Sequence, residues 1–189
     1  MQKTKISASP ISDQILDRLV QRITPKAALN ELPITGSPKR IMQEITRTMK
    51  TQPLRDSEKS RLVLFAGSSA KTKTIAAEVV ANVLGVDLYR IDLKQVVNKY
   101  IGETEKNLAK LFDWAKRANA VLFFDEADAL FGKRTDVRAA NDRYANLETG
   151  YLLERIEIYN GVVILSTNLI RNMDKAIHRR ADWMVEFSK

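Results

Sequence analysis

Residues Val121–Arg134 read VLFFDEADALFGKR, and this stretch decides the fold. Its first four residues form a continuous apolar run, which is typical of a strand buried on both faces of a parallel sheet. Two adjacent carboxylates, Asp125 and Glu126, follow directly. Open α/β sheets bind ligands at the carboxyl ends of their strands, where these acids lie. Acids also favour helix N-termini, but desolvated carboxylates need a partner, so the pattern favours a cation or a reacting water.

Further apolar runs along the chain predict the other strands of the same sheet. They are Arg61–Ala66, Leu88–Asp92, Val162–Ser166 and Met184–Phe187. Apolar residues at helical spacing predict helices between these strands, over residues 75–84, 105–117 and 143–158. Strands that alternate with helices predict an α/β fold, a doubly wound parallel sheet flanked by helices.

The N-terminal part has helical periodicity instead of strand runs. Ile15, Leu16, Leu19, Val20 and Ile23 predict one face of a helix that begins near Ser12 and stops at Thr24–Pro25. Ser37 and Pro38 predict the start of a second helix, whose buried stripe comprises Ile41, Met42, Ile45 and Met49. We therefore expect a short helical N-terminal extension with a linker, residues 1–60, before an α/β domain over residues 61–189.

Composition excludes several classes of protein. The chain has 189 residues, is 44% hydrophobic and contains no cysteine, so disulfide frameworks and thiolate metal sites are excluded. It has neither an apolar run near the ~20 residues of a membrane span nor an apolar N-terminal signal, and we expect a cytoplasmic protein with no membrane span. The net charge is +8, but basic and acidic residues are mixed along the chain, which favours an ordinary solvated surface over nucleic-acid binding.

The strand at 61–66 leads into GSSAKTKT, residues 67–74, which we call the phosphate loop. A strand, a polar turn with Lys-Thr and a helix form the arrangement of a phosphate-binding loop. The candidate nucleotide-binding residues are Gly67, Ser68, Ser69, Ala70, Lys71, Thr72, Lys73 and Thr74.

Four motifs in order carry a family resemblance. KYIGETEK at residues 99–106 is followed by FFDEADALFGKR, then by STN at residues 166–168, then by two arginines. In these motifs, over Leu62–Phe187, the chain resembles the AAA family of ring-forming ATPases, in the clade of proteasomal, Cdc48-like and katanin-like enzymes. Within this clade, its sequence is similar to those of bacterial single-domain members. The resemblance implies ATP and Mg²⁺ as cofactors.

The resemblance also implies roles for residues at the nucleotide. Lys73 matches the phosphate-binding lysine, and Thr74 matches the hydroxyl that binds magnesium. Asp125 matches the magnesium-binding acid, and Glu126 matches the acid that activates water. Asn168 matches the sensor asparagine that helps to orient this water.

Two further roles concern neighbouring molecules. Arg179, with Arg180 as the adjacent alternative, matches the arginine finger offered to the nucleotide of a neighbouring subunit. Tyr100 matches the pore-loop aromatic residue that grips a polypeptide substrate.

The chain departs from the family pattern at the phosphate loop. Thr72 stands where GxxxxGK[ST] has its second glycine, and residues 68–71 replace the usual Pro-Pro-Gly-Thr. A β-branched residue there predicts a steric obstacle and backbone strain of about 1–3 kcal/mol. Lys71 adds a positive charge, which we expect to offset part of the lost amide contacts to the phosphates. The sequence ends at Lys189, so we expect no helical lid, and Asp182 stands where a second arginine is common.

Intact acids and an altered loop leave two main hypotheses open. In the first, the chain is the ATP-binding domain of a ring-forming ATPase that remodels proteins or assemblies, with a weakened nucleotide grip. In the second, it is a pseudo-ATPase that acts as a scaffold, or as an arginine-finger donor to an active AAA subunit. The expected partners are copies of itself or an active AAA subunit, and a protein substrate. A basic nucleic-acid-binding domain is a remote third alternative.

Overall fold

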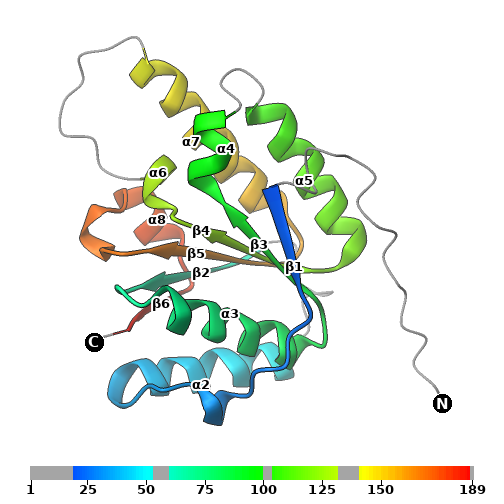
Figure 1. The fold of residues 1–189 in the computed structure, drawn as a ribbon, viewed down its shortest axis with the longest axis vertical. Coiled ribbons are helices and arrows are strands. Elements are labelled where there is room, and N and C mark those ends of the chain that lie inside the picture. Colours follow the sequence, from blue (N-terminus) through cyan, green and yellow to red (C-terminus); the bar gives the residue numbers. More distant parts are fainter. Residues whose placement is uncertain (1–18, 53–59, 100–103, 132–140, 188–189) are drawn as a thin grey trace.

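A six-stranded sheet forms the centre of the structure, a computed structural model that describes residues 19–52, 60–99, 104–131 and 141–187. The strand order is β1-β3-β4-β5-β2-β6, in which β1 is antiparallel to β3 and every other neighbouring pair is parallel (Figure 1). The strands are β1 (Val20–Ile23), β2 (Arg61–Ala66), β3 (Leu88–Asp92), β4 (Val121–Asp125), β5 (Val162–Thr167) and β6 (Trp183–Glu186).

Helices cover both faces of this sheet, so the described chain has three layers (Figure 1). One face is covered by α2 (Gly36–Thr51) and α3 (Ala70–Leu84). The other face is covered by α4 (Leu93–Lys99), α5 (Thr104–Ala118), α6 (Asp128–Phe131), α7 (Asn141–Ile158) and α8 (Lys175–Arg180). Two short 3-10 turns, η1 (Leu29–Glu31) and η3 (Ile170–Asn172), complete the described elements.

Alternation along the strands divides the core between these layers. On β4, Phe123 packs toward α2 and α3, whereas Phe124 packs toward α5 and α7, because successive side chains point to opposite faces. All residues of β4 are buried, which explains its continuous apolar run. No helix in the described part of the chain is both long and apolar enough to cross a membrane.

The predicted α/β fold is confirmed, with a sheet that is parallel except at one edge. The strands over residues 61–66 and 88–92 have the predicted bounds, and the strand at 162 is one residue longer than predicted. The helix predicted across residues 20–23 is wrong, because these residues form β1 and pair with residues 88–91 of β3. The rest of that predicted helix, residues 12–18, lies outside the described residues.

The second predicted helix is confirmed, and its N-cap is Thr35 instead of Ser37. Met42, Ile45 and Met49 are buried as predicted, and Ile41 is half-buried. This helix packs beside α3 and β6. The predicted division of the chain at residue 60 stays a prediction.

Gly67 ends β2 at a point of very close backbone approach. Its φ is +136°, a conformation that residues with a side chain rarely adopt. A Cβ atom at this position would lie 2.4 Å from the carbonyl oxygen of Phe187, the residue after β6. The glycine is therefore required by the packing of β2 against the end of β6.

We predict that Gly67→Ala lowers the free energy of unfolding by about 1–3 kcal/mol, the range for one residue in a strained backbone conformation. Gly150→Ala is the matched control, because Gly150 lies exposed within α7 with no atom near the added Cβ. This control should gain about 0.5–1 kcal/mol. Urea denaturation measures both changes, and equal changes in the two variants would contradict the assignment.

Candidate functional site

The helix after the phosphate-loop strand begins earlier than the sequence predicts. It starts at Ala70, whereas the apolar pattern predicts its start at Ile75. Ser69 is its N-cap, and the Ser69 Oγ accepts hydrogen bonds from Thr72 N at 3.2 Å and from Thr72 Oγ1 at 2.8 Å. An N-cap side chain that satisfies a first-turn amide stabilises a helix start. The open turn between β2 and α3 is therefore short, and Ser68, Ser69, Ala70 and Lys71 are exposed.

Thr72 does not carry the strained backbone that the sequence predicts. The non-glycine residues with positive φ among those described are Asn119 and Glu126, so Thr72 lies within the helix without that strain. The strain is avoided because the early helix start gives Thr72 an ordinary helical conformation, which a β-branched residue accepts.

Lys73 is buried at the carboxyl edge of the sheet, with only 2% of its surface exposed. Its Nζ donates to the carbonyl oxygen of Thr167 at 2.9 Å and to the Oδ1 of Asn168 at 3.1 Å. Burial lowers the pKa of the Lys73 ammonium, and the nearby carboxylates, Asp125 foremost, oppose this shift. The structure thus brings the predicted phosphate-binding lysine, the sensor asparagine and the acid together.

Asp125 ends β4 and forms an ion pair with Arg90 of β3. The Asp125 Oδ2 accepts from Arg90 Nη2 at 2.5 Å and from Arg90 Nε at 3.2 Å, while its Oδ1 accepts from the amide of Glu126 at 3.0 Å. Burial is the largest single influence and would raise the pKa of Asp125, but the hydrogen bonds and charge of Arg90, together with Ser166 and the amide of Glu126, outweigh it and hold this pKa below its ordinary value. The carboxylate is therefore held in its ionised form, with both of its oxygens engaged in hydrogen bonds.

Glu126 follows in a left-handed conformation, with φ of +53°. Such a conformation is uncommon for a residue with a long side chain. Its carboxylate is exposed, and the Glu126 Oε2 lies 3.8 Å from Lys94 Nζ. The turn thus places the Glu126 carboxylate in solvent beside the buried Asp125. A carboxylate that is to activate a water molecule needs this access to solvent.

Asp128 fixes the backbone at the end of β5. It accepts a short hydrogen bond from the hydroxyl of Thr167, and it accepts from the amide of Asn168 at 3.3 Å. The amide side chain of Asn168 in turn accepts from Lys73. Asp128 is therefore a positioning group for the predicted sensor residue.

The arrangement fits a magnesium ion held with few protein ligands. Mg²⁺ commonly takes one or two carboxylates together with waters and substrate phosphates. Asp125 supplies one carboxylate, and in the described chain no cluster of three acidic or histidine residues forms a complete cage. The buried Ser166 hydroxyl has no hydrogen-bond partner of good geometry in the described chain. Its proximity nevertheless contributes to the lowered pKa of Asp125. The Thr74 hydroxyl donates to the carbonyl of Ala70 at 3.0 Å, which leaves its oxygen able to bind a cation.

The two candidate finger arginines, Arg179 and Arg180, are neighbours in α8 and differ in their surroundings. Arg180 Nη2 donates to the carbonyl oxygen of Ser60 at 2.9 Å and to its Oγ at 2.8 Å, and Arg180 also pairs with Asp182 at 3.5 Å. Arg179 is exposed. Ser60 precedes β2, whereas the phosphate loop follows it, so the two ends are separated by roughly 20 Å of strand.

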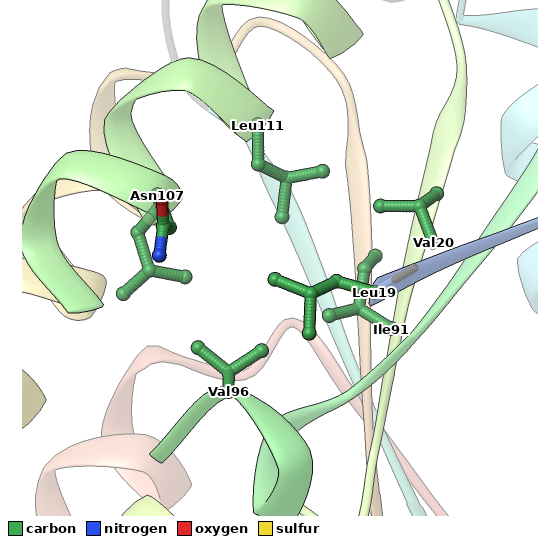
Figure 2. A pocket seen from close by; sticks show the side chains of 7 residues that line it. Leu19, Val20, Ile91, Val96, Asn107 and Leu111 are labelled. Carbon is green, nitrogen blue, oxygen red and sulfur yellow. The ribbon is translucent and has the colours of Figure 1, made fainter. Parts of the chain in front are cut away.

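The pore-loop candidate Tyr100 lies outside the described residues. A small apolar pocket lies elsewhere, between β1, α4 and α5 (Figure 2). Its lining is apolar apart from Asn107, whose buried amide nitrogen has no partner in the described chain. This pocket has no cationic side chain and does not contribute to the phosphate site.

Sequence reasoning missed Arg90, Lys94 and Asp128. The sequence signal for Arg90 is a charged residue within the otherwise apolar run of β3, which marks a buried or half-buried partner. Asp128 is part of the DEAD segment but was not assigned a role. Lys94 has no sequence signal that distinguishes it from other surface lysines.

Comparisons with known proteins show the family to which the chain belongs. The model of the family described as ATPase family associated with various cellular activities (AAA) matches residues 63–189. The uncharacterized AAA family ATPase y4kL of Sinorhizobium fredii is 32% identical over 174 residues, which cover 90% of this chain and 52% of that protein. The proteasome-activating nucleotidase of Methanoculleus marisnigri is 33% identical over 131 residues, which cover 66% of this chain and 32% of that protein. The chain thus spans about half, or less, of the length of these relatives.

A solved structure shares the fold. It is that of the HORMA:CdnC:Trip13 complex of E. coli MS115-1, in which the matching chain superposes with a TM-score of 0.65 at 22% identity. The match covers 92% of this chain and 71% of that chain. At this identity the likeness supports the fold alone.

We predict that Asp125→Asn lowers the free energy of unfolding by about 1.5–3 kcal/mol at pH 7, because it removes a charge-assisted hydrogen bond. The folded-state pKa lies below the ordinary value of about 3.9, so this stability is present above that pH and is lost as pH falls through the folded-state pKa. The difference between the variant and the unaltered chain should therefore shrink below about pH 4.

Urea denaturation at pH 7 and at low pH measures this difference. Asp87→Asn is the control, because Asp87 pairs with Arg22 in a similar geometry at the exposed edge. It should lose less than about 1 kcal/mol. A loss for Asp125→Asn that is the same at both pH values would contradict the account.

Proposed function

The chain belongs to the AAA family of ATPases, and from this premise we propose that it is the ATP-binding domain of a ring-forming ATPase. Its activity is the coupling of ATP hydrolysis to the remodelling of proteins or assemblies, with a weakened grip on the nucleotide. The observation that carries the proposal is the buried Lys73, held by Asn168 and Thr167 beside Asp125. A buried cation at the start of the helix that follows a strand is the arrangement that binds phosphate.

Each described group at this edge has a place in the proposed reaction. Lys73 uses two of its three N–H donors on Thr167 and Asn168, so one donor remains for a phosphate oxygen. Asp125 and Thr74 would hold magnesium, which supplies charge neutralisation on the phosphates when it is bound. Glu126 is exposed and would orient and deprotonate the attacking water.

Arg179 is the better candidate for the arginine finger in this proposal. It is exposed, whereas Arg180 donates two hydrogen bonds to Ser60. Because its neighbour Arg180 is bonded to Ser60, at the opposite end of β2 from the phosphate loop, we infer that Arg179 would act on the nucleotide of a neighbouring subunit. This geometry supports a ring of copies, or a mixed ring with an active AAA subunit, as the assembly.

The substrate and the location are inferred from the relatives. Two of them are named for the proteasome, the nucleotidase of M. marisnigri and the 26S proteasome regulatory subunit 7 homolog B of Arabidopsis thaliana, which is 36% identical over 132 residues covering 28% of that protein. This supports a protein substrate, gripped by Tyr100, and a cytoplasmic location.

The weakened grip follows from the geometry of the phosphate loop. A cradle for phosphates needs backbone amides that are free to point at them. Here the amide of Thr72 donates to Ser69, and its hydroxyl donates to the same oxygen. The side chains of Ser69 and Thr72 thus occupy the hydrogen-bonding groups at the start of α3. A nucleotide must break these hydrogen bonds before the loop can surround its phosphates.

We predict that the unaltered chain binds magnesium-ATP more weakly than micromolar, and that Thr72→Gly binds it about ten-fold more tightly, which corresponds to about 1.4 kcal/mol. Glycine removes both the side chain that opposes the phosphates and the hydroxyl bound to Ser69. Greater backbone freedom opposes this gain by about 0.5–1 kcal/mol. Calorimetric titration with ATP and magnesium measures the affinities.

Two control variants separate the causes of this change. Thr72→Ser keeps the hydroxyl that donates to Ser69, so it should bind ATP like the unaltered chain. Lys73→Ala removes the buried cation and should abolish binding in the Thr72→Gly background. Micromolar or tighter binding by the unaltered chain would contradict the weakened grip, and ATP binding that survives Lys73→Ala would contradict the site.

A further inference from the structure

Arg90 binds the carboxylate of Asp125, the proposed metal-binding acid, and the proposed reaction gives Arg90 no role. Two of its nitrogens, Nε at 3.2 Å and Nη2 at 2.5 Å, donate to the same oxygen of Asp125, Oδ2. The second oxygen, Oδ1, accepts from the amide of Glu126. Both carboxylate oxygens are therefore engaged, in an acid whose side chain is only 9% exposed.

The sheet itself builds this pair. Arg90 lies opposite Phe123 in the parallel register of β3 and β4, two residues before Asp125. Residues two apart on a strand share a face, so Arg90, Phe123 and Asp125 all lie on the face that α3 covers. The Arg90 side chain is 36% exposed, so it can leave Asp125 without unfolding the core.

A guanidinium and a divalent cation are both attracted to the negative charge of this carboxylate, so they compete for it. The guanidinium stays charged at every physiological pH, so it does not release Asp125 by losing a proton. Magnesium is usually held through one or two carboxylates, and here Asp125 is the described carboxylate that ends β4. A cation that approaches Oδ2 therefore meets a fixed positive charge at hydrogen-bond distance.

We propose that Arg90 is a positioning residue that holds Asp125 in place when the metal is absent and competes with a divalent cation for Asp125 Oδ2. The magnesium requirement of this chain is consequently higher than Asp125 alone would set. This inference rests on the proposed role of Asp125 as a metal-binding group. It does not depend on tight nucleotide binding.

The test uses Mn²⁺ alone, without nucleotide, on the full chain. Paramagnetic broadening of the Glu126 amide signal in ¹H–¹⁵N spectra reports metal at Asp125, because this amide donates to Asp125 Oδ1. Arg90→Gln should lower the half-saturating Mn²⁺ concentration by about three- to five-fold, the size expected for one partly exposed charge interaction. Asp125→Asn should remove the saturable broadening.

Arg22→Gln is the matched control. Arg22 of the edge strand β1 pairs with Asp87, which precedes β3, through the same two nitrogens, Nε at 3.0 Å and Nη2 at 2.6 Å, and this pair does not include Asp125. This variant should leave the half-saturating concentration unchanged. Arg90→Lys keeps the charge with a single donor group, and it should give a value between those of Arg90→Gln and the unaltered chain.

Three results would overturn the proposal. The first is an unchanged or higher half-saturating concentration in Arg90→Gln. The second result applies if Arg90→Gln does not fold: the half-saturating Mn²⁺ concentration of Arg90→Lys equals that of the unaltered chain. The third is no saturable broadening at Glu126 in any chain up to about 20 mM Mn²⁺, well beyond a millimolar dissociation constant. Because no nucleotide is present, failure of ATP binding leaves the result interpretable.

Discussion

The buried ammonium of Lys73 is the constraint on which the carboxyl edge of the sheet depends. A lysine that is 2% exposed needs hydrogen-bond acceptors and opposite charges, because an isolated buried charge is unstable. Its hydrogen-bond acceptors come from the end of β5. The carboxylate with the largest electrostatic influence on it, Asp125, comes from the end of β4. The helix that carries Lys73 follows β2, which lies beside β5 in the sheet. The strand order therefore brings a cation, an acid and the side-chain amide of Asn168, far apart in the sequence, to one place.

Much of this could be predicted from the sequence, because buried parallel strands are continuous apolar runs. The runs at residues 61–66 and 121–124 indicate both their strands and the edge of the sheet where the proposed nucleotide site lies. The edge strand β1 could not be predicted in this way, since Leu19, Val20 and Ile23 also fit helical spacing and the strand is stabilised by pairing with β3, almost 70 residues away. The early start of α3 depends on the side chain of Ser69, and the role of Arg90 depends on an acid 35 residues distant. Such contacts leave no periodic signal in the sequence.

The proposed site combines the groups that the proposed reaction needs with two features that oppose ligand binding. The start of α3 is closed by the hydrogen bonds between Ser69 and Thr72, and Asp125 is closed by Arg90. Neither feature removes a group that the proposed reaction needs. Each places a local partner where a phosphate or a cation would bind, so each weakens binding by competition. Such competition raises the concentrations of nucleotide and magnesium at which the proposed site fills.

The central claim is that the carboxyl edge between β4, β5 and β2 is the nucleotide site. It is tested most directly by ¹H–¹⁵N spectra of the full chain, titrated with magnesium and a non-hydrolysable ATP analogue into the millimolar range that a weakened grip requires. The account predicts saturable shifts concentrated at the amides of residues 67–74, Asp125–Glu126 and Thr167–Asn168. Shifts concentrated instead around the apolar pocket between β1 and α5, or no saturable shift at these amides up to about 10 mM nucleotide, would contradict it.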